Sequence, residues 1–61
     1  MDNKRHHQFC TEDGTIIANI LTNDLLLGNG DLIKLDEKYY QIKQKELNIS
    51  EMSWKFTVKM M

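Results

Sequence analysis

Residues 53–60 carry the pattern that most restricts how this chain can fold. Apolar side chains at Trp54, Phe56, Val58 and Met60 alternate with polar ones at Ser53, Lys55, Thr57 and Lys59. Alternation with a period of two places the two kinds of side chain on opposite faces of a β-strand. In a helix, at about 100° per residue, the same apolar side chains would scatter around the circumference without forming a stripe. The segment is therefore predicted to be a strand with one buried face.

Four more short segments have the composition of strands and are separated by turn-forming residues. Asp13-Gly14 and Asp36-Glu37-Lys38 are connections of hairpin length, and glycine at the first of them accepts positive φ without steric cost. A helix over residues 37–52 is the main alternative to the fourth strand, because this window contains neither Gly nor Pro. Its apolar residues, however, form no stripe at helical spacing. We predict strands over residues 6–11, 15–21, 31–35, 39–47 and 53–60.

The fourth predicted strand does not keep one phase of alternation to its end. Lys43 and Lys45 would face outward, but the apolar residues Leu47 and Ile49 fall on the same parity. A bulge near Glu46, or a turn that starts there, would return these two apolar side chains to the core.

A chain of 61 residues forms at most one small domain, which buries roughly 60% of the surface exposed when it is unfolded. Five short strands in such a chain cannot cover the face of a flat sheet unless the sheet curls on itself. We therefore predict a single all-β domain, a five-stranded meander curled into a partly open barrel, with residues 1–5 as a flexible tail. The predicted core consists of Ile16, Ala18, Ile20, Ile33, Leu35, Tyr40, Ile42, Trp54, Phe56 and Val58.

The stretch from Gly30 to Leu35, followed by Lys38 to Ile42, resembles the centre of small SH3-like barrels. In that fold a glycine–aspartate turn opens a strand, and a tyrosine-bearing strand pairs with it. The resemblance covers about a quarter of the chain. It implies a fold rather than a function, since SH3-like barrels bind proteins, RNA and DNA alike.

Composition narrows the setting in which the protein is expected to work. The longest apolar run, Leu25-Leu26-Leu27, is far shorter than the roughly 20 residues of a membrane helix. The first ten residues are too polar for a signal peptide, and the single cysteine fits a reducing compartment. We expect a cytoplasmic protein, and the abundance of Lys, Asn and Ile suggests a bacterial or phage origin.

His6, His7 and Cys10 are potential metal ligands that lie close together in the sequence, yet we expect neither a metal site nor a catalytic centre from them. Adjacent histidines on a strand point to opposite faces, and the spacing matches no structural zinc pattern. A cysteine nucleophile would also need an oriented base and an oxyanion hole. Residues 28–30 have the glycines of a phosphate loop but not its lysine or its helix, so we expect a turn with positive φ. The predicted protein is not an enzyme and takes no cofactor.

The first binding hypothesis is a protein-interaction surface for a protein partner or a second copy of the chain. Apolar side chains at Leu25, Leu26, Leu27 and Met60 would supply an adaptable patch. The leucines are bracketed by turn residues, so they are equally suited to form a short or helical turn that plugs an open end of the barrel. We predict a small non-enzymatic accessory or adaptor domain.

The alternative hypothesis is nucleic-acid binding through the outer face of the last two strands. If these strands pair, Tyr39, Lys43, Lys45, Lys55 and Lys59 are expected on one solvent-facing side. Lysines would contact phosphates and the tyrosine would stack on a base. Such lysines also serve to keep an exposed sheet soluble and to block edge pairing. The net charge of −1 argues against binding by bulk charge.

Overall fold

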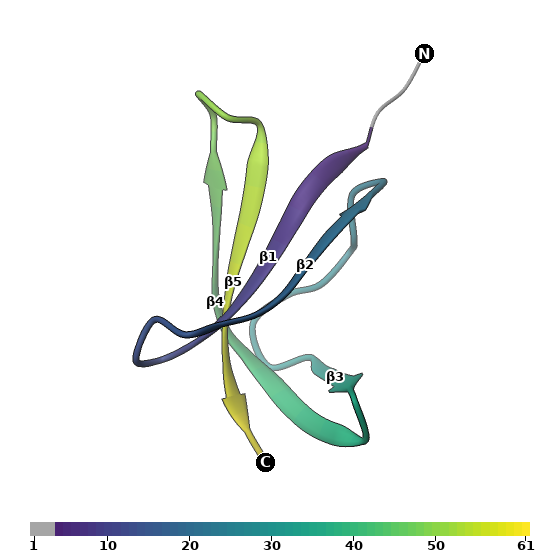
Figure 1. Cartoon of the computed structure of the whole chain (residues 1–61), viewed down its shortest axis with the longest axis vertical. Coiled ribbons are helices and arrows are strands. Elements are labelled where there is room, and N and C mark those ends of the chain that lie inside the picture. The colour runs from purple at the N-terminus through teal and green to yellow at the C-terminus, as the bar shows by residue number, and fades with distance from the viewer. Residues whose placement is uncertain (1–3) are drawn as a thin grey trace.

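The computed structural model describes residues 4–61, which form one five-stranded sheet (Figure 1). The strands are β1 (Arg5–Thr11), β2 (Ile16–Thr22), β3 (Leu32–Leu35), β4 (Lys38–Asn48) and β5 (Ser53–Met60). Their order across the sheet is β2-β1-β5-β4-β3. β1 pairs with β5 in parallel, and the other neighbours pair antiparallel. This is the order of a meander whose first and last strands have joined and whose barrel stays open between β2 and β3.

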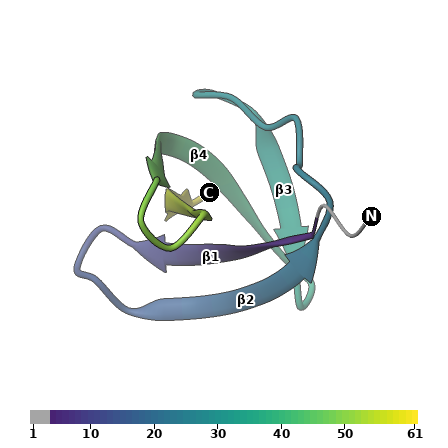
Figure 2. The same ribbon diagram turned by 90° about the horizontal axis from the view of Figure 1, so that it is seen from above.

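The sheet is strongly curled, as the view from above shows (Figure 2). The prediction of an all-β, partly open barrel is confirmed, and no helix occurs in residues 4–61. All five predicted strands are present, although β1 begins at Arg5 and β4 continues to Asn48. Most of the tail predicted over residues 1–5 lies outside the described residues.

The turn between β1 and β2 has the chemistry that its sequence predicts. Gly14 has a φ of 93°, and its N–H donates to the carbonyl of Thr11 at 3.0 Å. The Asp13 carboxylate accepts a hydrogen bond from the N–H of Thr15 at 3.0 Å and another from the Thr11 hydroxyl. A glycine in the left-handed region as the last residue of a three-residue loop is a common hairpin closure.

The turn between β3 and β4 has a less favourable composition. Asp36 and Glu37 connect the strands directly, with φ values of 49° and 67°. Turns with positive φ at both central residues normally use Asn and Gly, because a Cβ atom disfavours this region. The predicted pairing is nevertheless correct, and Ile33 lies opposite Tyr40.

The segment between β2 and β3 crosses the open side of the barrel. It ends in the predicted turn, where Gly30 has a φ of 93° and the N–H of Asp31 donates to the carbonyl of Gly28 at 3.1 Å. Gly30 and Asp31 also bond through their backbones to Ile42 of β4. Upstream, Leu27 packs against the core without any helical turn. One leucine therefore plugs the barrel, rather than all three.

The core lies on the concave face of the sheet. It is formed by Phe9, Tyr40, Ile42, Phe56 and Val58, against which Ile17, Ala18, Leu27, Ile33, Leu35 and Trp54 pack. The rings of Phe9 and Phe56 stack with centroids 5.0 Å apart. Phe9 is not among the predicted core residues, none of which belongs to β1, yet β1 lies between β2 and β5 and its concave side is covered.

Two predicted core residues are exposed, and a bulge explains the first of them. The pairing of β1 with β2 shifts from Phe9 opposite Ala18 to Cys10 opposite Ile16, which leaves Ile17 as the extra residue. The extra residue reverses the alternation. Ile17 packs against the core instead of Ile16, which is 57% exposed. Ile20 is 38% exposed because it lies on the sheet edge, where no strand covers its flank.

A second bulge lies in β4, at Lys43 and not near Glu46 as predicted. The register with β5 passes from Ile42 opposite Val58 to Gln44 opposite Thr57. Beyond it Lys45 lies opposite Phe56 and Leu47 opposite Trp54, so both share the concave side. Ile49 stays 68% exposed in the following turn, and its predicted return to the core is wrong.

Candidate interaction surface

The open barrel leaves two strand edges without a neighbour in the sheet, one at β2 and one at β3. The β3 edge is protected against pairing. It has four residues, includes the exposed Lys34 and runs directly into the charged turn Asp36-Glu37. Short length and charged side chains are the usual means by which sheet edges avoid further strands.

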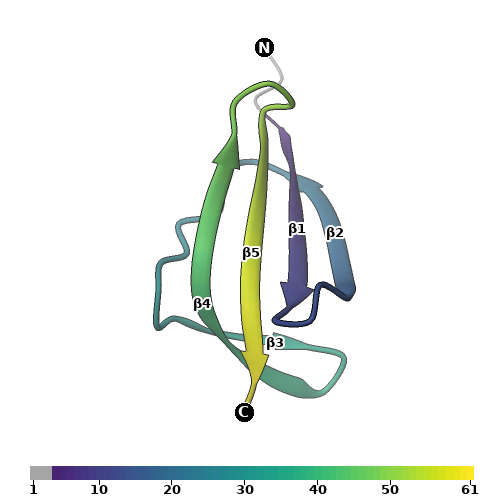
Figure 3. The ribbon, with the colours of Figure 1, turned by 90° about the vertical axis from the view of Figure 1, so that its left-hand side faces the viewer.

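The β2 edge has the opposite character. It has seven residues, and the sequence from 14 to 23 is the longest stretch of the chain without Asp, Glu, Lys or Arg. Ile16 and Leu21 are 57% and 56% exposed. β2 forms an outer margin of the molecule (Figure 3). An uncharged edge with free N–H and C=O groups is a template for another strand.

The segment that follows β2 does not cover this edge in the described structure. Its backbone hydrogen bonds run within the turn at Gly30 and to Ile42 of β4. At its start, Asp24 pairs with Arg5 of β1 and accepts a hydrogen bond from the indole N–H of Trp54 at 3.3 Å. These contacts direct the segment across the concave side, away from the β2 edge.

His7 of β1 also holds the segment between β2 and β3 through a hydrogen bond with Leu25. Its side chain is fully buried, with Nδ1 at 2.9 Å from the carbonyl oxygen of Arg5. Its Nε2 lies 3.3 Å from the backbone nitrogen of Leu25. A carbonyl accepts and an N–H donates, so the neutral ring carries its proton on Nδ1. His7 therefore joins β1 to the crossing segment and is a structural residue.

The predicted protein-binding residues do not form one patch. Leu26 is 97% exposed and Leu25 36%, next to the His7 end of β1. Leu27 packs against the core. Met60 is 57% exposed, but it lies beyond Val58, which pairs with Thr11 at the other end of β1. Sequence reasoning missed the β2 edge, although its long uncharged run was a signal for it.

The predicted lysine face is divided by the bulge in β4. Lys55 and Lys59 alternate with the buried Phe56 and Val58, so they lie on the convex face. Lys45 lies on the other face, with its Nζ 5.6 Å from the centroid of the Trp54 ring.

The positions and neighbours of three predicted residues interrupt that face further. Lys55 lies opposite Glu46 in the register. Lys43 is the bulged residue. Tyr39 is 55% exposed, and the Lys34 ammonium lies 5.6 Å from the centroid of its ring. The five residues therefore do not present a single basic surface.

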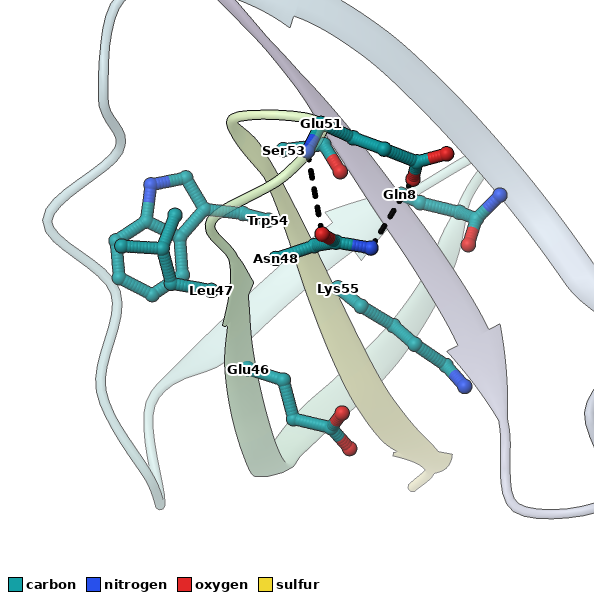
Figure 4. Close-up of a pocket in the computed structure, with 8 residues that line it drawn as sticks. All are labelled: Gln8, Glu46, Leu47, Asn48, Glu51, Ser53, Trp54 and Lys55. Carbon is teal, nitrogen blue, oxygen red and sulfur yellow. Dashed lines mark hydrogen bonds between the residues drawn. The ribbon is translucent and has the colours of Figure 1, made fainter.

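A hollow of about 230 Å³ lies at the turn between β4 and β5 (Figure 4). The Asn48 side chain shapes this turn: its oxygen accepts from the N–H of Glu51 at 3.2 Å, and its amide nitrogen donates to the Glu51 carboxylate at 3.1 Å. Both polar atoms of Asn48 are thus used in fixing the turn. The residues around the hollow are Gln8, Glu46, Leu47, Asn48, Glu51, Ser53, Trp54 and Lys55.

The two histidines and the cysteine have different hydrogen-bond partners. His6 is exposed, with Nδ1 3.2 Å from the side-chain oxygen of Asn19, whereas His7 is buried on the other face. The buried Cys10 thiol contacts the side-chain oxygen of Gln8 at 3.8 Å. Within residues 4–61 no three His, Cys, Asp or Glu side chains gather in an arrangement suited to a metal ion.

Comparison of the chain with protein-family models, with curated proteins and with solved structures gave no match. Residues 4–61 contain no helix of the length and apolarity needed to cross a membrane.

Proposed function

We propose that this chain is a non-enzymatic protein-interaction domain that binds through the free edge of β2. The observation that supports this role is the uncharged edge itself, with Ile16 and Leu21 more than half exposed on it. A partner strand that extends the sheet gains affinity from backbone hydrogen bonds and specificity from the alternating side chains. The exposed Leu25 and Leu26 follow directly in the chain and would extend the contact.

Nucleic-acid binding is the weaker candidate on the same structure. Lys45 is separated from Lys55 and Lys59 by the bulge, and Glu46 lies opposite Lys55. Affinity for a phosphate backbone depends on many cations acting together. Because Lys45 lies on the other face and Glu46 lies opposite Lys55, the convex face offers fewer cations than the predicted lysine surface.

The setting we propose for the domain follows from the same features. The buried free thiol of Cys10 fits a reducing compartment, and we place the protein in the cytoplasm. The curled barrel and the hairpin at Asp36 fit an SH3-like domain, a fold class that includes protein-binding members. The abundance of Lys, Asn and Ile supports the proposal of a bacterial or phage origin.

Site-specific photo-crosslinking tests the proposed function. A benzophenone amino acid replaces Leu21 on the β2 edge or, as a matched control, Leu32 on the β3 edge, where the exposed fraction is 58%. The purified chains are illuminated alone, in cell extract and with oligonucleotides. We expect protein adducts from position 21 well above those from position 32, and little effect of added salt.

A third probe at Lys55 separates the two functions. Adducts with oligonucleotides from position 55 that fade as salt rises would support nucleic-acid binding instead. Equal protein adducts from positions 21 and 32 would contradict a binding role for the β2 edge.

A further inference from the structure

We infer that the strand added to the β2 edge is β2 of a second copy of this chain. This inference rests on the proposed function, because it names the partner of the same edge. The two strands would pair antiparallel about a two-fold axis at Ile20, so that one sheet runs continuously through both copies.

The side chains of β2 suit this symmetric pairing. With the axis at Ile20, Ile20 faces its own copy, Ala18 faces Thr22 and Asn19 faces Leu21. Residues opposite each other in an antiparallel pair share a face, and here concave-side residues meet concave-side residues. The segment from 18 to 22 lies beyond the bulge at Ile17, so its alternation is regular.

Charge favours a second copy over a partner of opposite charge. In a two-fold interface every residue near the axis meets its own copy or a close neighbour of it, so a charged residue there would repel itself. The chain carries no Asp, Glu, Lys or Arg from 14 to 23. An edge adapted to a charged partner strand would be expected to carry the complementary charge, and this one carries none.

The contrast between the two edges explains why assembly would stop at two copies. Pairing of β2 with β3 of the next copy would be head-to-tail and would continue into a filament. The β3 edge is short and carries Lys34 next to a charged turn, which disfavours that route. Each copy therefore has one edge available, and the symmetric pair uses both. Self-association also suits a chain with so small a core.

The experiment measures molar mass against concentration by sedimentation equilibrium for the whole chain. We expect the mass to rise from 7.2 kDa toward twice that value. Leu21→Lys and Leu21→Glu should each raise the dissociation constant of the dimer at least about tenfold, because each places like charges across the axis. Leu32→Lys is the matched control on the β3 edge and should leave it unchanged.

Mixing the two Leu21 variants sharpens the test. Residue 21 of one copy lies diagonally across from residue 21 of the other, about 7–8 Å away and within reach of long side chains. An equimolar mixture of Leu21→Lys and Leu21→Glu should therefore recover most of the lost association. Circular dichroism verifies that each variant remains folded.

A measurement on the unsubstituted chain does not depend on any variant folding. In a mixture of isotope-labelled and unlabelled chain, nuclear Overhauser effects between copies should involve residues 18–22. Contacts from the β3 edge, growth beyond two copies, or equal weakening by Leu32→Lys would overturn the inference. A monomer at every concentration whose position 21 crosslinks to another protein would also overturn it, while leaving the proposed function in place.

Discussion

The two hairpins at the margins of the sheet, β1–β2 and β3–β4, differ both in the conformation of their turns and in the charge of their free edges. In the β1–β2 hairpin the turn is well made, with Gly14 in the left-handed region and Asp13 bonded to both sides of the loop. In the β3–β4 hairpin Asp36 and Glu37 occupy positive φ without a glycine. The first hairpin exposes an uncharged edge, whereas the second protects its edge with charge.

This difference shows that, in the β3–β4 hairpin, turn quality and edge protection depend on the same residues. The charged residues that strain the β3–β4 turn also prevent this edge from pairing, since Asp36 and Glu37 follow directly on β3. The β1–β2 hairpin has a favourable turn and leaves β2 open to a partner strand. A good turn thus accompanies the edge proposed for binding, and a strained turn accompanies the edge that is closed to it.

Removal of the side chain that anchors the first hairpin should have the largest effect. His7→Ala removes a fully buried ring that stacks on Phe56 at 6.1 Å and bonds the backbone at both nitrogens. We expect the free energy of unfolding to fall by about 3 kcal/mol. Urea denaturation followed by the fluorescence of Trp54, the one tryptophan, measures it.

His6→Ala is the matched control for this prediction. His6 is exposed and its hydrogen bond to Asn19 is a surface contact, so the loss should stay within about 0.5 kcal/mol. Equal losses for the two variants would show that the contacts of His7 do not hold the hairpin to the crossing segment.

Local patterns predicted the strands and turns well because each of these depends on a few neighbouring residues. The alternation from Trp54 to Val58 marked β5 correctly, and Gly14 and Gly30 marked turns with positive φ. The curl of the sheet also followed, because a flat sheet of this size cannot bury its face.

The bulges decided what the sequence could not predict. The phase of Leu47 showed that β4 needs a bulge, but its position at Lys43 depends on the pairing with β5. Likewise, Ile16 and Ile17 are chemically alike, and the pairing with β1 determines which of them faces the core. A shift of one residue in the register moves a side chain to the other face of the sheet. Because of the bulge at Lys43, Lys45 lies on the concave face and not on the predicted lysine surface.

The quality of the first turn can be tested by adding a single methyl group. At Gly14 a Cβ atom would meet no atom within 4 Å, so the cost of Gly14→Ala comes from the φ of 93° alone. We expect a loss of about 1–2 kcal/mol in the free energy of unfolding. Gly28→Ala is the control, because its φ is not in this region and its Cβ would make an ordinary 3.8 Å contact with Asp31. Similar losses at both positions would argue against backbone strain.

Relief of strain in the second turn should give a smaller change of opposite sign. Glu37→Gly places glycine at a φ of 67° and should stabilise the protein by about 0.5–1 kcal/mol, after the added flexibility of the unfolded chain is counted. The ion pair with Lys34, at 3.6 Å on the surface, contributes little.

Glu46→Gly makes the same replacement within β4 and should instead destabilise the protein by about 0.5–1 kcal/mol. Thermal unfolding followed by circular dichroism compares the two variants. A loss of stability at both positions would mean that the second turn carries no strain for glycine to relieve.

The smallest expected effect is the loss of stability at low pH when the Asp13 carboxylate, which bonds to both sides of the first turn, is protonated. The hydrogen bond from the Thr11 hydroxyl, and to a smaller extent that from the Thr15 N–H, lowers the pKa of Asp13 below its ordinary 3.8. The folded state thus favours the charged carboxylate more than the unfolded state does. Its contribution to stability is present above pH 3.8 and is lost as the pH falls through the lower pKa of the folded chain.

A carbon-detected NMR titration of the Asp13 carboxyl should show this pKa directly, and Thr11→Val should move it back toward 3.8. A pKa at or above 3.8 in the folded chain would mean that the carboxylate does not hold the turn. The better-made hairpin would then owe its geometry to Gly14 alone.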